Sequence, residues 1–215
     1  MAPPPRPRPL DARPLLPAPS RPGYRSHEIV DRAFSPGECD RIVALGTARA
    51  AETGALSAAA GAREDATLRR SRISWVPPGP GADWIYARLA RLVARANRRW
   101  RFELTGFAED LQFTRYDEPG AFYTWHQDGL DGEVALRKLA VVVQLSDPDH
   151  YGGGDLQLFD VSVDLDPADL ADWTARVRAR GAAVVFPAFE YHRVMPLEHG
   201  ERHSLVAWVS GPPFR

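Results

Sequence analysis

The sequence predicts an α+β chain, mainly β, in which helices come first and short strands follow. Apolar residues recur with a helical period as far as about residue 99. From Leu111 onward they alternate with the period of strands, and glycine and proline interrupt the pattern. A chain of 215 residues is long enough to bury a core. Short strands after helices favour a sandwich or barrel in the β half.

The composition is that of a globular chain. Hydrophobic residues make up 44% of it and the formal net charge is −1, which excludes wholesale disorder and favours neither nucleic acid nor a membrane as a partner. Cys39 is the only cysteine, so an intrachain disulfide and a thiolate zinc site are excluded. No apolar run approaches the ~18 residues of a membrane span, and the N-terminus lacks the apolar segment of a secretion signal. We therefore expect a cytoplasmic protein.

The chain divides into a tail and one domain. Residues 1–22 contain nine prolines mixed with arginines, which excludes a helix interior or a sheet ladder. We expect this segment to be a flexible Pro/Arg-rich tail, and residues 23–215 to form a single domain. We favour an N-terminal leader without a binding role over a segment that binds a proline-recognition module.

Three helices are expected in this domain. Ser35, Pro36 and Glu38 form a capping box with proline at the first helical position, which predicts a helix to about Ala48. A second helix is predicted over 82–99, with an apolar stripe and arginines on its other faces. We interpret these arginines as a solvated face rather than a phosphate footprint. The third helix is predicted over 166–178. The strands are predicted at 70–76, 111–116, 122–128, 138–145, 155–161, 182–186 and 202–210.

Two histidines and an aspartate form the candidate metal site. His126 and Asp128 are two residues apart in a predicted strand, so both side chains project from one face. His192, which follows a buried-looking strand and a turn, is the best third ligand. Two imidazoles and one carboxylate leave open positions on a metal, as an iron(II) oxygenase requires.

A carboxylate-binding pair lies in the last predicted strand. Arg202 and Ser204 share one face, and a guanidinium beside a hydroxyl suits a carboxylate. Polar side chains also share one face of the strand at 111–116, namely Gln112, Thr114 and Tyr116. In the strand at 138–145 one face carries Ala140, Val142 and Gln144. The first of these faces fits a wet pocket better than a core, although solvent would suit it too, and the second leaves room for a cosubstrate.

Several spaced motifs resemble the prolyl-4-hydroxylase-like branch of the 2-oxoglutarate/iron(II) oxygenases. The resemblance covers about residues 34–215 and is strongest after Gln112. The residues that carry it are Tyr116, Gly120, Tyr123, His126, Asp128, Arg137-Lys138-Leu139, Leu145-Ser146-Asp147-Pro148, Tyr151-Gly152-Gly153-Gly154-Asp155-Leu156, Gly181, Val184-Val185-Phe186-Pro187, His192-Arg193-Val194, Arg202 and Ser204-Leu205.

The resemblance implies a fold, cofactors and residue roles. The fold is a double-stranded β-helix (a cupin-like jelly roll) supported by the N-terminal helices. His126, Asp128 and His192 would bind Fe(II) and form the catalytic centre. Arg202 would bind the distal carboxylate of 2-oxoglutarate with help from Ser204, while Tyr116 would hydrogen-bond this cosubstrate and Gln144 would face it. O2 is the other cosubstrate, and ascorbate could act as reductant.

The activity implied is that of a dioxygenase that hydroxylates an unactivated C–H bond and releases succinate and CO2. We expect a residue of a peptide or protein, such as proline, as substrate. A free amino acid or a natural-product intermediate stays open, as does a jelly-roll binding module with a structural metal. We expect no nucleic-acid and no membrane partner. Oligomeric state and pathway stay open.

The chain departs from the family pattern in two places. Arg202 stands where collagen-type enzymes have a lysine. The segment 162–180 is longer and more helical than the usual connection, and its role stays open.

Overall fold

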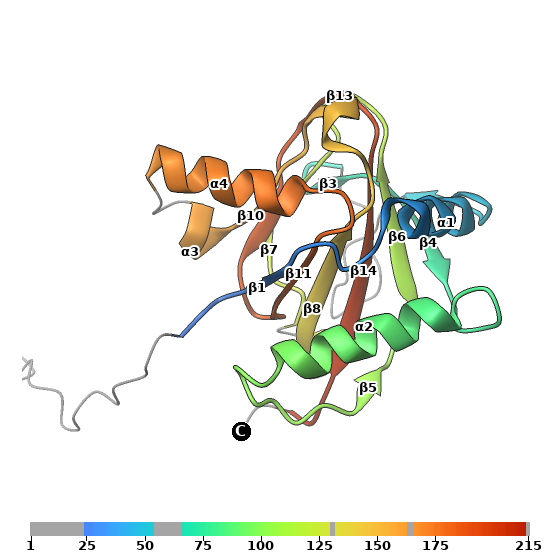
Figure 1. Ribbon diagram of the computed structural model, residues 1–215, viewed down its shortest axis with the longest axis vertical. Helices are drawn as coiled ribbons and strands as arrows, with labels where there is room; N and C mark the ends of the chain where they lie inside the picture. Colours follow the sequence, from blue (N-terminus) through green and yellow to red (C-terminus); the bar gives the residue numbers. More distant parts are fainter. Residues whose placement is uncertain (1–23, 54–65, 130–131, 163–165, 214–215) are drawn as a thin grey trace, which may run out of the picture.

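The structure is a computed structural model that describes residues 24–53, 66–129, 132–162 and 166–213. Two facing sheets form its centre, and the strand pairings within the described residues are antiparallel. This is the architecture of a double-stranded β-helix, so the predicted fold class is confirmed (Figure 1). The predicted tail, residues 1–22, lies outside the described residues.

The larger sheet has eight strands in the order β1-β11-β8-β14-β6-β4-β2, and β5 also pairs with β14. Its strands are β1 (Glu28–Val30), β2 (Glu52–Thr53), β4 (Arg72–Val76), β5 (Gly106–Phe107), β6 (Leu111–Tyr116), β8 (Arg137–Gln144), β11 (Ala183–Pro187) and β14 (Arg202–Ser210).

The smaller sheet has four strands in the order β10-β12-β7-β3, and two further strands, β9 and β13, pair with each other. Their bounds are β3 (Arg69–Arg70), β7 (Phe122–His126), β9 (Tyr151–Gly153), β10 (Leu156–Leu158), β12 (His192–Val194) and β13 (Leu197–Gly200).

Helices cover the outside of the sheets. Helices α1 (Pro36–Thr47) and α2 (Asp83–Ala96) pack on the outer face of the larger sheet, whereas α4 (Pro167–Arg178) and the single turn α3 (Phe159–Ser162) lie beside β10 (Figure 1). Two short 3-10 turns complete the fold, at Gly132–Leu136 and Pro148–His150. None of the helices that the structure describes is long and apolar enough to cross a membrane.

Local sequence signals explain the helices. Ser35 caps α1 and forms the predicted capping box with Glu38, because each side chain bonds the backbone N–H of the other. The stripe of α2 is buried as predicted, at Ile85, Leu89, Val93 and Ala96. Helix α4 begins after Asp166, whose carboxylate accepts from two backbone N–H groups.

The strand predictions need three corrections. The strand predicted over 70–76 is divided at Ser71 between β3 and β4, which belong to different sheets. The strand predicted over 155–161 ends at Leu158, where the chain turns into α3. The strand predicted over 122–128 ends at His126, so Asp128 lies beyond it. Six other strands of the described residues carry no sequence prediction: β1, β2, β5, β9, β12 and β13 have only two to four residues each, too few for a period to be visible.

Two buried clusters fill the fold. One lies between the larger sheet and helices α1 and α2, and the other lies between the sheets. Consecutive residues of β8 alternate between them: Leu139, Val141 and Val143 face the helices, and Ala140 and Val142 face the space between the sheets. The candidate site lies on this second side.

Candidate metal centre and anion-binding pocket

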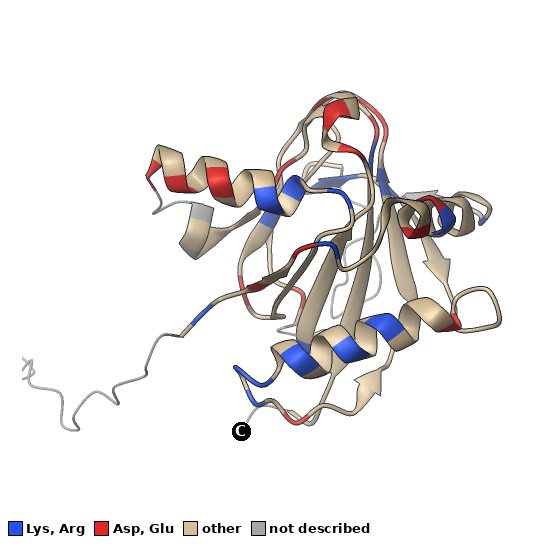
Figure 2. Ribbon diagram, in the orientation of Figure 1, with Lys and Arg blue, Asp and Glu red and all other residues tan. Residues whose placement is uncertain are grey.

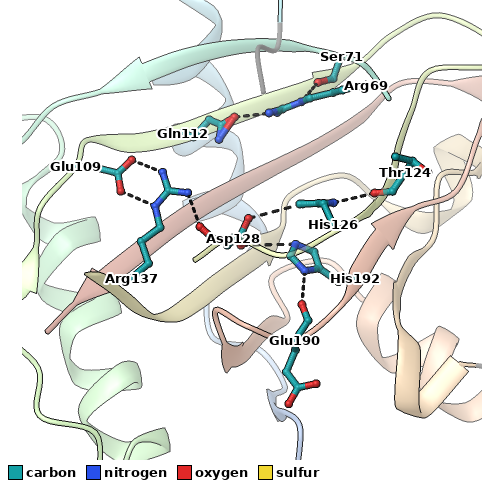
Figure 3. Close-up of polar contacts among 10 residues, drawn as sticks. All are labelled: Arg69, Ser71, Glu109, Gln112, Thr124, His126, Asp128, Arg137, Glu190 and His192. Atoms are coloured by element: carbon teal, nitrogen blue, oxygen red, sulfur yellow. Dashed lines mark hydrogen bonds and ion pairs between the residues drawn. The ribbon is translucent and has the colours of Figure 1, made fainter. Parts of the chain in front are cut away.

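Three side chains converge between the sheets to form a candidate metal centre, the His–Asp–His cluster (His126, Asp128 and His192). Their donor atoms all lie within 4.8 Å of one another. The Asp128 carboxylate lies between the imidazoles, with Oδ1 at 3.6 Å from His126 Nε2 and Oδ2 at 3.5 Å from His192 Nε2 (Figure 3). Asp128 and His192 are buried, and His126 is half-buried. Three donor atoms at this spacing can bind one metal ion.

Strand pairing brings the cluster together. His126 at the end of β7 pairs directly with His192 at the start of β12. Asp128 does not lie in a strand as predicted, but a turn holds it in place: the N–H groups of Asp128 and Gly129 both donate to Ala188 O, at 2.8 and 3.1 Å. The three predicted ligands are therefore adjacent, although the reason given for Asp128 was wrong.

Backbone carbonyls fix the orientation of both imidazoles. His126 Nδ1 lies 2.8 Å from Thr124 O, and His192 Nδ1 lies 3.0 Å from Glu190 O. Carbonyl oxygens only accept, so each Nδ1 carries the proton and each Nε2 presents its lone pair to the cluster. This is the usual support of a metal-binding histidine. Sequence reasoning missed both contacts, but their common spacing of two residues is a signal that strand geometry could have supplied.

The electrostatics favour an anionic carboxylate beside a neutral His126. Burial, and to a smaller extent the neighbouring His192, lower the pKa of His126 to about 3. Burial alone would raise the pKa of Asp128, but the two histidines and Arg137 outweigh it and hold this pKa below its usual value. His126 and Asp128 are therefore already in the protonation states that bind a divalent ion.

Arg137 ties the Asp128 turn to the end of the large sheet. Its Nη1 donates to Asp128 O at 3.0 Å, and its other nitrogens bind both carboxylate oxygens of Glu109 (Figure 3). The guanidinium also lies over the Trp208 ring, 3.8 Å from its centroid. Such a bidentate pair fixes geometry as well as charge.

The predicted carboxylate-binding pair lies on the inner face of the larger sheet. Arg202 pairs with Tyr116 across β14 and β6, and Ser204 pairs with Gln144 across β14 and β8. Arg202 and Ser204 are both 2% exposed. The guanidinium lies 5.3 Å from the centroid of the Tyr116 ring. The structure therefore places Arg202, Ser204 and Tyr116 together, as the sequence predicts.

Two buried polar atoms of this pocket lack a partner among the described residues: Arg202 Nη1 and Thr114 Oγ1. A buried guanidinium nitrogen without an acceptor is costly, and an anion in the pocket would satisfy it. Gln144 differs, because its Nε2 donates to the Tyr151 hydroxyl at 2.7 Å. Its amide nitrogen is thus used within the protein, and its role toward a cosubstrate stays a prediction.

Arg69 is a second buried arginine that sequence reasoning missed. It donates to Ser71 Oγ and Gln112 Oε1, both at 2.8 Å, and lies over the Tyr123 ring at 4.6 Å (Figure 3). Tyr123 in turn stacks on His126, with ring centroids 3.4 Å apart. The exposed-looking pattern Arg69-Arg70 gave no sign that the first arginine is buried.

The fold and part of the sequence are similar to known oxygenases. Residues 111–210 match the sequence model of the 2OG-Fe(II) oxygenase superfamily. A PKHD-type hydroxylase of Synechococcus elongatus is 36% identical over 103 residues, which are 46% of this chain and 42% of that protein. One of Janthinobacterium is 32% identical over 103 residues, 45% and 41% of the two chains. The chain thus spans less than half of the length of these relatives.

Solved structures support the fold. A prolyl-4-hydroxylase of Pseudomonas putida superposes with a TM-score of 0.59 at 23% identity, over 87% of this chain and 93% of that one. A prolyl hydroxylase of Trichoplax adhaerens, solved with a hypoxia inducible factor peptide fragment, superposes with a TM-score of 0.65 at 17% identity, over 86% and 83%. The region that matches the family begins at β6 and ends with β14, so it contains the whole His–Asp–His cluster and Arg202. By the sequence of residues 111–210 the chain is similar to the 2OG-Fe(II) oxygenase superfamily, and by its fold it is similar to the prolyl hydroxylases.

Proposed function

We propose that this protein is a dioxygenase that uses iron(II) and 2-oxoglutarate to hydroxylate a C–H bond of a peptide or protein residue such as proline. The observation that carries the proposal is the buried Arg202 Nη1, which lacks a partner among the described residues, in the same fold as the His–Asp–His cluster; Tyr116 interacts electrostatically with both Arg202 and Asp128. A structural metal site has no use for a buried anion-binding group. Peptide substrates are supported by the prolyl hydroxylases among the structural neighbours, one of which was solved with a peptide.

The residues present fit the metal. His126, His192 and Asp128 would hold iron(II) through two Nε2 atoms and one carboxylate oxygen, a donor set that leaves coordination positions free. Arg202 and Ser204 would bind the distal carboxylate of 2-oxoglutarate, and Tyr116 lines the same pocket. Burial raises the pKa of Tyr116, so its hydroxyl keeps the proton and can donate to an anionic ligand.

When bound, iron(II) and 2-oxoglutarate supply the oxidising power: O2 places one atom in the substrate and the other in succinate, and CO2 is released. The protein supplies position. Thr124 O and Glu190 O orient the imidazoles, and Arg137 holds the turn that carries Asp128. The closed inner face of the sheet keeps bulk water away from the pocket. Ascorbate would serve only to restore iron(II) after unproductive turnover.

The test is spectroscopic and needs no substrate. The metal-free protein receives iron(II) and 2-oxoglutarate without oxygen, and the visible charge-transfer band of the chelate is recorded. We expect a band in the wild type that His192→Ala abolishes. Tight metal binding without a band would contradict the proposal and favour a binding module with a structural metal. Turnover is then compared between proline-containing peptides and free amino acids, and a preference for the free acids would overturn the peptide assignment.

A further inference from the structure

The N-terminal segment leaves the described domain beside the candidate site. β1 pairs antiparallel with β11, with Glu28 opposite Val185, so the chain before Glu28 runs along the continuation of β11. The Tyr24 hydroxyl donates to the carboxylate of Glu190. Trp100 Nε1 holds the same stretch by donating to Arg25 O at 2.9 Å. Tyr24, the first residue that the structure describes, is therefore attached at the turn that follows β11.

This turn, residues 188–190, is one wall of the His–Asp–His cluster. Ala188 O accepts from the N–H of Asp128, and Phe189 O accepts from Gln127 Nε2. Glu190 O accepts from Nδ1 of His192. The side chain that holds Tyr24 thus belongs to the same residue that orients a candidate metal ligand. The N-terminal segment starts from the edge of the site itself.

Three aromatic side chains adjoin the turn and form what we name the aromatic rim: Phe159 and Tyr191 are exposed and Trp125 is half-buried. Tyr191 is 50% exposed and Phe159 is 52% exposed, and the Phe159 N–H donates to Tyr191 O at 2.9 Å. Trp125 meets Phe159 edge to face at 5.5 Å, with Arg193 over its other side at 4.5 Å. Flat aromatic surfaces of this kind bind proline rings of extended peptides.

The composition of the N-terminal segment complements this rim. It contains nine prolines, four arginines and one aspartate between residues 1 and 22. The acidic group at its point of attachment is Glu190, which binds Tyr24, and Figure 2 shows further acidic residues along the first half of α4 and basic residues along the second half. Helix α4 adjoins the attached stretch, because Trp173 Nε1 lies 3.4 Å from His27 Nε2. The aromatic surface and the proline content therefore favour the same occupant.

The contour length of the segment sets how far its prolines can reach from Tyr24. In an extended proline-rich conformation the chain rises ~3.1 Å per residue. Pro19 and Pro14 are therefore separated from Tyr24 by contour lengths of about 15 and 30 Å. A tether of this length gives an effective concentration in the millimolar range.

We propose that prolines of the N-terminal segment are hydroxylated by the site of the same chain. This inference rests on the proposed function and names a substrate for it. A ring C–H bond of the proline is replaced by C–OH: one atom of O2 enters the ring and the other enters succinate. 2-Oxoglutarate loses CO2, and the displaced hydrogen ends on the new hydroxyl group. No further reductant is required.

The full-length chain provides the test. Metal-free protein isolated under nitrogen receives iron(II) and 2-oxoglutarate and is then exposed to isotopically labelled O2. Mass spectrometry of peptides from residues 1–22 should show the gain of labelled oxygen on proline, at a rate per chain that does not change on dilution. Replacement of the nine prolines by alanine should abolish the gain.

Two controls sharpen the test. Tyr24→Phe removes the bond to Glu190 and should slow the modification about threefold, the effect of one modest hydrogen bond, with the 2-oxoglutarate chelate band unchanged. In the second control a His126→Ala chain with its tail is mixed with an active chain that lacks residues 1–22. The tail should then stay unmodified at low protein concentration, whereas equal modification would overturn reaction within one chain.

The failure of this inference is distinguishable from failure of the proposed function. A normal chelate band without oxygen gain on the tail overturns self-hydroxylation and leaves the dioxygenase proposal standing. The absence of the band overturns both.

Discussion

The two faces of the larger sheet make opposite use of the same strands. On the outer face, Leu139, Val141 and Val143 of β8 are fully buried under helices α1 and α2. On the inner face the row continues from Ala140 and Val142 to the polar Gln144. β6 and β14 place Thr114, Arg202 and Ser204 on the same inner side.

The apolar outer face contributes to the stability of the fold, whereas the polar inner face contributes to ligand binding. Burial of the outer face stabilises the fold by roughly 25 cal/mol per Å² of apolar surface. The inner face instead buries polar groups, and Arg202 Nη1 and Thr114 Oγ1 have no partner among the described residues. Each such group destabilises the empty protein by about 1–3 kcal/mol. Changes on the outer face should therefore affect folding, and changes on the inner face should affect ligand binding.

The largest effect is expected at the only anionic group of the cluster. Asp128→Ala should weaken divalent metal binding by more than about 100-fold, since it removes the negative charge between two imidazoles. The metal-free variant should unfold below the wild-type temperature, because the lowered pKa of Asp128 means that its charge stabilises the folded state. Calorimetric metal titration and thermal unfolding check the two parts. If this variant bound metal with wild-type affinity, the inner face would not be the site of ligand binding, and the comparison of the two faces would fail.

A smaller effect on binding is expected from the anion pocket. Arg202→Ala should weaken 2-oxoglutarate binding by about 10- to 100-fold, the contribution of a charged hydrogen bond, and leave metal affinity unchanged. Arg193→Ala is the matched control, because Arg193 lies over Trp125 and bonds Gln157, outside the pocket. Equal losses in both variants would place the anion site elsewhere.

The outer face is tested by two glycines of α1. A Cβ on Gly46 would lie 2.2 Å from the Phe113 ring, whereas a Cβ on Gly37 would meet nothing within 4 Å. Gly46→Ala should lower the free energy of unfolding by about 1–3 kcal/mol, and Gly37→Ala should leave it unchanged or raise it slightly. Denaturant unfolding measures both. Loss of 2-oxoglutarate affinity in the folded Gly46→Ala protein would show that the faces are not independent.

The smallest effect concerns the thiol of Cys39, which is buried in the outer-face core. Burial raises its pKa from 9.0 to about 11, so the unfolded chain releases this proton at lower pH than the folded one. The thiol should therefore cost no stability below pH 9, and the free energy of unfolding should fall as the pH rises from 9.0 toward about 11. Cys39→Ala should flatten that part of the curve. If the free energy of unfolding of the variant fell with pH at the same slope, the pH dependence would belong to other groups.

Local signals in the sequence predict the elements that carry them. The capping box at Ser35, the stripe of α2 and the alternation in β6 and β14 are each visible within one segment, and the structure confirms them. Short strands such as β12 form because neighbours pair with them, so their own residues show no period. The family resemblance predicted the closed fold, which the local pattern left as a sandwich or barrel.

The same distinction holds in the site. The side chains of His126, Asp128, His192 and Arg202 were predictable because residue type and spacing carry the chemistry. Thr124 O and Glu190 O are backbone atoms, which any residue supplies, and the burial of Arg69 depends on Gln112 from another strand. The position of Asp128 depends on Ala188 O, a contact that sequence spacing does not encode. Tertiary contacts decide the positions of Arg69 and Asp128, whereas the two carbonyl contacts join residues only two apart.

The bond between Asp128 and Ala188 also has a kinetic consequence. It joins the end of β7 to the turn after β11, segments far apart in the chain, and His192 follows directly. Contacts of such long range form late, because loop closure must be completed first. Metal uptake should therefore coincide with the last phase of folding, and a partly folded chain would carry no redox-active iron.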